Sequence, residues 1–204
     1  HYPADVLADL AGMWPAGLVA DGDLAAISTP IDVLGVNYYT TNMFRAAGPG
    51  EPWAKVTANI SAPDAVGVQR DLPLTAIGWE IEPDGLRRLL LRLHADYTGP
   101  VGTALVITEN GAAFDDRADA DGFVDDADRI DYLRGHLAAV HAAIGEGADV
   151  RGYLAWSLMD NFEWAEGYAK RFGIVRVDGL QRRIPKASAL WFGDLARTGR
   201  LDLP

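Results

Sequence analysis

The most constraining feature of this sequence is the run Ala104–Thr108 (ALVIT), which is apolar without alternation and ends abruptly at Glu109. A strand without a polar face must be buried on both faces, which is typical of parallel sheets covered by helices. Ile31–Tyr38 and Tyr153–Leu158 are two further apolar runs of strand length. The sequence therefore predicts an α/β fold built on a parallel sheet.

Two helical stripes separate these three strands. Leucines repeat at i, i+3, i+4 and i+7 after Pro83, and a second stripe covers Ile130–Ile144 and stops near Gly145. Shorter helices are expected at Pro3–Leu10 and Pro185–Leu195, and a hairpin arm at Gly173–Asp178. The stretch from about Thr41 to Trp79 is predicted to be irregular, and loops of that length are usually functional.

Each predicted strand leads at its carboxyl end into side chains that can do chemistry. These are Asn37, Tyr38 and Tyr39 after the first, Glu109 and Asn110 after the second, and Trp156 and Ser157 after the third. Ligands of barrels and open α/β sheets bind at this end, where side chains from several strands converge. We therefore expect a ligand site there.

Charge and composition narrow the ligands. The chain has 18 Lys and Arg against 29 Asp and Glu, which gives a formal net charge of −11. Such a chain repels other anions, so we expect neither nucleic acid nor an anionic membrane as a partner. There is no cysteine, hence no disulfide or thiolate site. No apolar stretch is long enough to span a bilayer, and the expected location is cytoplasmic. A neutral small molecule is the favoured ligand.

Neither a metal nor a cofactor is predicted. Residues 115–131 carry eight aspartates, but in a calcium-loop register the first position is Arg117 and the last is Asp128 rather than Glu. A solvated loop that caps the following helix is favoured instead. His136 and His141 are five residues apart and lie on different helix faces, and Ser157 lacks a G-x-S-x-G context.

Three motifs in order, NYYT (Asn37–Thr40), ITENGAAFDD (Ile107–Asp116) and WSLMDNFEWAEGYAKRFG (Trp156–Gly173), resemble the C-terminal portion of a family 1 glycoside hydrolase, the β-glucosidase family. The resemblance extends over residues 1–204. It implies an incomplete (β/α)8 TIM barrel, the C-terminal segment of one domain with about the last three barrel strands and without the N-terminal ones. This fits a chain of 204 residues, since such barrels usually need about 250.

The resemblance also implies roles for individual residues in a retaining β-glycosidase. Glu109 matches the nucleophile, Tyr39 the tyrosine that hydrogen-bonds it, and Asn37 lies beside that tyrosine. The substrate-binding residues implied are Glu163 and Trp164 for the non-reducing sugar, Trp156 and Phe172 around it, and Trp79 beside the aglycone. Tyr38 is expected in the core, because adjacent strand residues face opposite ways.

The general acid of the family lies in an Asn-Glu-Pro motif, which is absent from this sequence. The isolated chain is therefore expected to be inactive and to need the N-terminal barrel portion. A small β-glucoside or oligosaccharide is the expected substrate, and an anionic Glu163 disfavours a 6-phosphate. Two alternatives stay open: a non-catalytic carbohydrate-binding protein, and a thioglucosidase whose leaving group needs no protonation.

Overall fold

The computed structural model describes residues 2–15, 17–49 and 65–201. The chain divides into two compact units, His1–Asp32 and Val33–Pro204. The first unit contains two short helices, α1 (Ala4–Asp9) and α2 (Asp23–Ile27), and α1 confirms the helix predicted near the N-terminus. All residues discussed below belong to the second unit.

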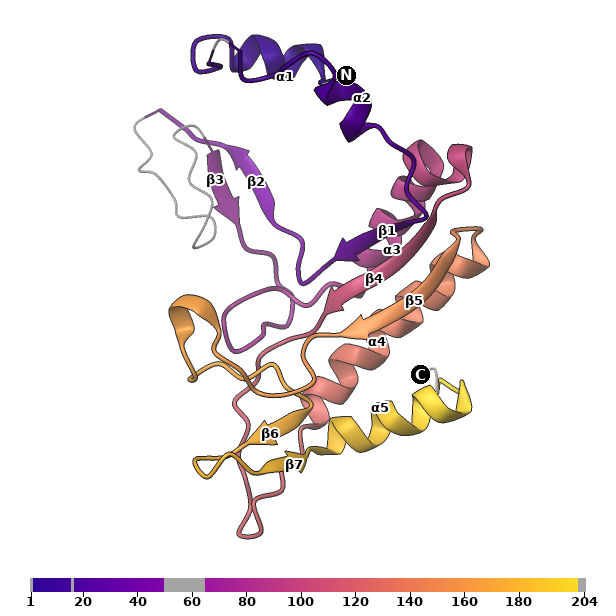
Figure 1. The fold of residues 1–204 in the computed structure, drawn as a ribbon. Helices are drawn as coiled ribbons and strands as arrows, with labels where there is room; N and C mark the ends of the chain where they lie inside the picture. The colour runs from indigo at the N-terminus through magenta and orange to yellow at the C-terminus, as the bar shows by residue number, and fades with distance from the viewer. Residues whose placement is uncertain (1, 16, 50–64, 202–204) are drawn as a thin grey trace. The chain divides into compact units, whose positions relative to one another are not determined.

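A parallel sheet of three strands organises the second unit (Figure 1). Its strands, in spatial order, are β1 (Val33–Asn37), β4 (Ala104–Asn110) and β5 (Val150–Ala155). The third strand begins and ends three residues earlier than predicted. The reason is that Ser157 has left the sheet, and its backbone N–H donates to the carbonyl of Phe172 in the loop that follows.

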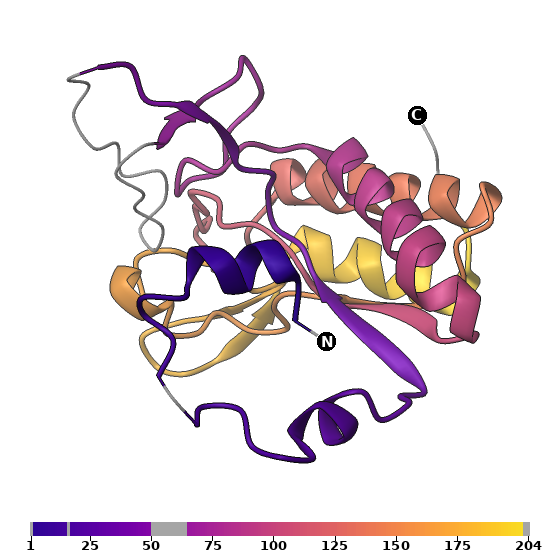
Figure 2. The ribbon, with the colours of Figure 1, turned by 90° about the horizontal axis from the view of Figure 1, so that it is seen from above.

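Three long helices accompany the sheet: α3 (Pro83–Leu93), α4 (Ala127–Gly145) and α5 (Ala187–Thr198). α3 and α4 lie next to each other against the strands (Figure 2). The core between sheet and helices contains Val36, Tyr38, Leu86, Leu90, Leu105, Ile107, Val140, Ala143 and Ala148. α3 and α4 confirm the two helices predicted from the stripes, although Ile144, the last residue of the second stripe, is 46% exposed. α5 confirms the last predicted helix and begins two residues after Pro185.

The two faces of the sheet differ in burial. Leu105 and Ile107 face the helices and are fully buried, whereas Val33 is 46% and Leu154 57% exposed. The expectation of burial on both faces was therefore wrong for this unit, because no described helix of the unit covers the second face. In a closed barrel that face would point to the interior.

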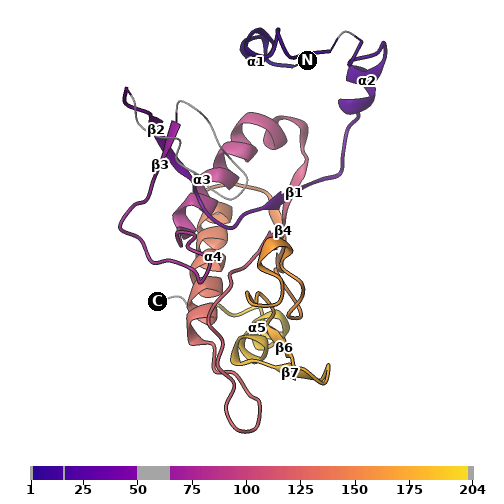
Figure 3. The ribbon, with the colours of Figure 1, turned by 90° about the vertical axis from the view of Figure 1, so that its left-hand side faces the viewer.

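Two small antiparallel sheets flank the carboxyl ends of β1, β4 and β5 (Figures 1 and 3). β2 (Met43–Ala46) pairs with β3 (Ala65–Val68), inside the stretch that was predicted to be irregular. That prediction was wrong because each strand has only four residues and no tight-turn signal joins them. β6 (Val175–Val177) pairs with β7 (Arg183–Pro185), which confirms the hairpin arm. None of the described helices is both long and apolar enough for a membrane span.

Candidate active site

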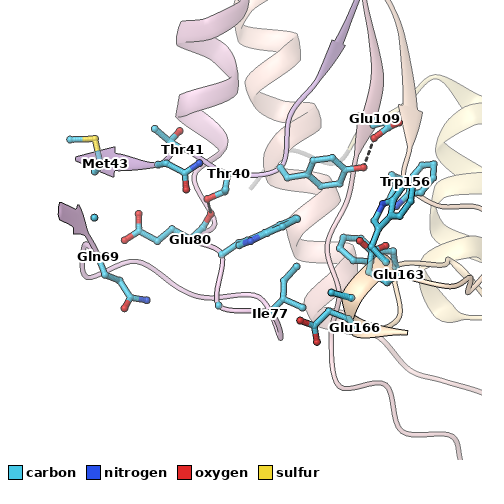
Figure 4. A pocket seen from close by; sticks show the side chains of 18 of the residues that line it. Thr40, Thr41, Met43, Gln69, Ile77, Glu80, Glu109, Trp156, Glu163 and Glu166 are labelled. Atoms are coloured by element: carbon cyan, nitrogen blue, oxygen red, sulfur yellow. Dashed lines mark hydrogen bonds between the residues drawn. The ribbon is translucent and has the colours of Figure 1, made fainter. Parts of the chain in front are cut away.

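A cavity of about 1240 Å³ opens at the carboxyl ends of the strands (Figure 4). A concave site with aromatic and polar side chains in its lining is typical of small-molecule binding sites. Its lining comes from the residues after β1, the β2–β3 hairpin, the segment before α3, the end of β4 and the loop after β5. Segments far apart in sequence thus form one site.

A carboxylate and a phenol meet at the centre of this lining. Glu109 lies near the end of β4. Tyr39 lies two residues after the end of β1, the strand that pairs with β4. The Tyr39 hydroxyl donates to Glu109 Oε2 at 2.6 Å (Figure 4). Burial, followed by the hydrogen bond to Glu109, raises the pKa of Tyr39 well above its usual range. The phenol therefore keeps its proton and remains a donor to the carboxylate.

Aromatic rings surround this pair. The Tyr39 ring lies 5.5 Å from that of Trp79 and 6.1 Å from that of Phe172, centroid to centroid. Trp156 and Trp164 also line the cavity, and Trp164 is 82% exposed. Flat apolar faces next to polar groups suit the C–H faces and hydroxyls of a sugar ring.

The lining of the cavity carries negative charge. Its charged lining residues are Glu80, Glu109, Glu163 and Glu166, and no Lys, Arg or His stands among the lining residues that the structure describes. Burial, and then the negative charges of Glu109 and Glu166, raise the pKa of Glu163. Glu80 is engaged elsewhere, since it accepts from Arg70 Nε at 2.7 Å. A neutral ligand fits this field better than an anionic one.

Two of the residues singled out from the first strand end lie away from the cavity lining. Asn37 comes two residues before Tyr39, so the two side chains point to the same side of the strand. The Oδ1 of Asn37 accepts from the Thr108 hydroxyl at 2.6 Å. Tyr38 is buried in the core, where its hydroxyl donates to the Glu82 carbonyl at 2.7 Å. The prediction that Tyr38 packs in the core is confirmed.

The sequence analysis missed a neutral hydrogen-bonded cluster behind the site, which we call the strand-end network. It consists of Asn110 on β4, Tyr132 on α4 and Tyr153 on β5. The apolar or amphipathic pattern around each residue gave no signal, because their contacts join three separate elements. Only the position of Asn110 directly after Glu109 pointed to it.

A second cluster, which we call the buried ion cluster, was also missed. It contains Lys186, Arg129, Asp116, Asp126 and Asp160, with Lys186 and Arg129 at most 1% exposed. Lys186 Nζ contacts Asp160 Oδ1 at 2.8 Å and donates to the carbonyl of Gly173 at 2.6 Å. Because Asp160 and Gly173 lie on either side of the loop that carries Glu163 and Phe172, this cluster fastens that loop.

The aspartate-rich segment corrects one further expectation. Asp126 makes no side-chain capping bond to α4, the helix that follows it. Its Oδ1 instead accepts from the backbone N–H of Ser188, in the first turn of α5, at 2.8 Å. The tertiary fold brings α5 to this carboxylate, and sequence proximity does not decide which helix it caps. Within the described ranges, no group of three or more His, Cys, Asp or Glu side chains is arranged to hold a metal.

Comparison with known proteins shows the family to which the chain belongs. Residues 1–200 match Glycosyl hydrolase family 1, and the chain belongs to this family.

Among curated relatives, the chain is 50% identical over 203 residues to thermostable beta-glucosidase B of Thermobispora bispora, covering 98% of this chain and 40% of the relative. It is 48% identical over 200 residues to the bifunctional beta-D-glucosidase/beta-D-fucosidase of Bifidobacterium breve, covering 94% of this chain and 43% of that protein. A solved beta-glucosidase from Thermotoga maritima in complex with noeuromycin superposes with a TM-score of 0.84 at 41% identity, over 99% of this chain and 42% of that one. The chain thus spans about two fifths of the length of these relatives and has a partial α/β fold.

Proposed function

We propose that this chain is the nucleophile-bearing C-terminal part of a retaining β-glycosidase that removes terminal β-D-glucosyl residues. The observation that carries the proposal is the 2.6 Å hydrogen bond from Tyr39 to Glu109 in a cavity walled by aromatic rings. Retaining glycosidases place two carboxyl groups about 5–5.5 Å apart, one as nucleophile and one as acid and base. Glu109 takes the first of these roles.

In this mechanism Glu109 attacks the anomeric carbon while the glycosidic C–O bond breaks, and the aglycone leaves with a proton from the general acid. Water, activated by the same acid/base residue, then hydrolyses the covalent glycosyl-enzyme and frees Glu109. The Tyr39 phenol holds Oε2 of Glu109, so that the other oxygen, Oε1, is available for attack. As the ester forms, the negative charge on the carboxylate disappears and the hydrogen bond from Tyr39 weakens. Because the phenol fixes the direction in which the attacking oxygen of Glu109 points, removing it should cost rate more than binding.

Glu163, Trp164 and Trp156 would bind the non-reducing sugar. Phe172 would close that side of the site, and Trp79 would lie beside the aglycone. Support comes from the lining of the cavity, in which these aromatic side chains accompany four glutamates. One relative, 40% identical over 182 residues, is the 6-phospho-beta-galactosidase of Streptococcus equi subsp. zooepidemicus. A 6-phosphate would meet only like charge among the described lining residues, so the proposed substrate is unphosphorylated. The proposed substrate is a small β-glucoside or a short oligosaccharide.

The general acid would come from chain that is not part of these 204 residues, since no Asn-Glu-Pro motif occurs among them. The partner of the fragment is therefore an N-terminal barrel portion, which would supply the remaining strands. Such a portion would also cover the exposed sheet face with Val33 and Leu154. On this proposal the 204 residues alone do not turn over substrate.

The test uses a fusion protein, in which the N-terminal portion of the Thermobispora bispora relative is joined ahead of residue 1. The fusion should hydrolyse an aryl β-glucoside, and Glu109→Gln should lower kcat by at least about 1,000-fold, because the nucleophile is lost. A 2-fluoro-glucoside should add its glycosyl mass at Glu109. The control is the 204-residue chain alone, for which we expect no turnover.

Different outcomes separate the alternatives. Reversible sugar binding by a folded fusion without turnover or covalent mass gain would replace the enzyme by a carbohydrate-binding protein. Turnover that Glu109→Gln leaves intact would remove Glu109 from the mechanism. The fusion does not test the choice between O- and S-glycosides, because the residue at its general-acid position comes from the relative. That choice would be decided by the residue at the general-acid position of this protein's own N-terminal portion.

A further inference from the structure

Asn110 stands where the ladder of the parallel sheet breaks on both sides. The register between β1 and β4 shifts between Val36 and Asn37, and the register between β4 and β5 shifts between Ile107 and Asn110. At such irregularities the backbone groups lose their regular partners. The strand ends, which carry Tyr39, Glu109 and Trp156, therefore depend on side-chain hydrogen bonds as well as on the backbone bonds that remain.

The side chain of Asn110 adds hydrogen bonds where the ladder is irregular. It is fully buried, and its Nδ2 donates to the carbonyl of Tyr38 at 2.7 Å and to the hydroxyl of Tyr132 at 3.1 Å. Its Oδ1 accepts from the hydroxyl of Tyr153. Both amide hydrogens and the amide oxygen are therefore used, so only an amide of this size and orientation satisfies the site.

These bonds lead directly to three residues of the cavity. The Tyr132 hydroxyl in turn donates a hydrogen bond to the carbonyl of Tyr39 at 3.1 Å. The backbone N–H of Tyr38 donates to the carbonyl of Glu109 at 2.9 Å, and that of Trp156 to the carbonyl of Asn110 at 2.8 Å. A directional chain thus runs from Tyr153 through Asn110 and Tyr132 to the backbone of Tyr39.

We infer that Asn110, acting with Tyr132, is a positioning residue for the reaction: the strand-end network sets the placement of the Tyr39 phenol against the Glu109 carboxylate. This inference rests on the proposed function of that pair. Asn110 is not itself among the residues that line the cavity, and it acts through the backbone of its neighbours. A misplacement of about 1 Å in such a pair costs about 100-fold in rate.

The informative variants remove hydrogen-bond donors of the network and change little volume. Asn110→Asp puts an acceptor oxygen where Nδ2 donates to the Tyr38 carbonyl, so that two oxygens face each other in a buried place. Tyr132→Phe removes only the hydroxyl between Asn110 and Tyr39. The matched control is Thr98→Val, which removes a buried hydroxyl bonded to the Leu93 carbonyl, far along the chain from the strand ends.

In the fusion protein, Asn110→Asp should lower kcat by about 10–100-fold, and Tyr132→Phe by several-fold, with KM within about threefold of the parent. Thr98→Val should keep both constants. A purely structural role would lower the amount of folded enzyme and leave kcat per folded molecule unchanged. Equal kcat for Tyr132→Phe and Thr98→Val would overturn the inference even if Asn110→Asp does not fold.

A second measurement needs no turnover. The fusion protein is labelled with 3-fluorotyrosine, and the fluorine resonance of Tyr39 is assigned by its loss in Tyr39→Phe. Tyr132→Phe should shift this resonance, whereas Thr98→Val should leave it in place; an unmoved resonance in Tyr132→Phe contradicts the inference. If instead the fusion keeps its activity in Glu109→Gln, the proposed function fails while the resonance still reports on the network.

Discussion

The strand-end network and the buried ion cluster hold neighbouring parts of one site by different physics. The network joins uncharged side chains on β4, β5 and α4 at the strand ends, where backbone hydrogen bonds of the sheet also act. The ion cluster joins segments outside the sheet, such as Asp116 after β4 and Lys186 before α5. Both connect residues about as far apart in sequence, 72 residues for Asn110 and Tyr38 and 70 for Lys186 and Asp116, so the difference between them is charge.

The difference predicts unequal costs of damage. A buried charge that loses its partner cannot be solvated, so breaking an ion pair costs more than removing one neutral hydroxyl. The following changes compare the two clusters directly, with the free energy of unfolding of the fusion protein measured by urea titration.

The largest effect is expected from Lys186→Met. It leaves Asp116 and Asp160 buried without the ammonium that both contact, and should reduce the free energy of unfolding by about 3–5 kcal/mol. The control is Arg197→Met, which breaks an exposed pair with Asp194 and should have little effect. Similar losses in both variants would show that the buried ion cluster is not the stronger fastening.

Gly111→Ala tests the backbone beside the strand-end network. A Cβ at this position would lie 1.7 Å from the carbonyl oxygen of Trp156, so the strand ends must move apart, at a cost of about 3 kcal/mol. Gly145→Ala is the control, because a Cβ there meets nothing within 4 Å and the residue ends a helix. We expect Gly145→Ala to be neutral or stabilising; a neutral Gly111→Ala would contradict the close approach.

His136 provides a way to put a charge next to the neutral network. Its ring stacks on Tyr132 with centroids 4.0 Å apart, and burial lowers its pKa to about 4 from an unfolded value of 6.5. Between these values the unfolded chain binds the extra proton, so stability is present above pH 6.5 and falls as the pH drops towards 4. The parent should lose about 2 kcal/mol more than His136→Asn between pH 7 and pH 4.5. Parallel curves for the two proteins would contradict a buried neutral His136.

The smallest effect is expected from Tyr153→Phe. It removes the one hydroxyl that donates to Asn110 Oδ1 and should reduce the free energy of unfolding by about 1 kcal/mol. A loss as large as that of Lys186→Met would erase the proposed difference between the two clusters. Sodium chloride up to about 1 M should leave this loss unchanged, because no charge is involved.

Much of the fold could be read from local patterns. The spacing of Leu86 and Leu90 marks the buried face of α3, and the apolar run before Glu109 marks β4, because both patterns follow from the geometry of a single element. The hairpin with Met43 and Val68 could not be found in this way, since short strands separated by many residues leave no local pattern. The end of β5 at Ala155 was also missed, because a contact with the distant Phe172 decides it.

Much of the candidate site could be read in the same way. The motifs named Tyr39, Glu109, Trp79, Trp156, Glu163, Trp164 and Phe172, all of which line the cavity. Asn37 was named too, yet its side chain bonds to Thr108 one step below the lining. Glu80 and Glu166 joined the lining without a signal of their own, because their loops are brought there by the fold.

The amino-acid sequence by itself determined the three strands of the parallel sheet to within a few residues, the longer helices, the family and the residues at the strand ends, because these depend on periodicity and on short motifs. Only the tertiary structure decided that Asn110 binds two strands and a helix, that Lys186 is buried among carboxylates, and that Asp126 caps α5. The physical reason is that a polar side chain is satisfied by whatever the fold places within about 3 Å, and those partners lie 13 to 72 residues away along the chain.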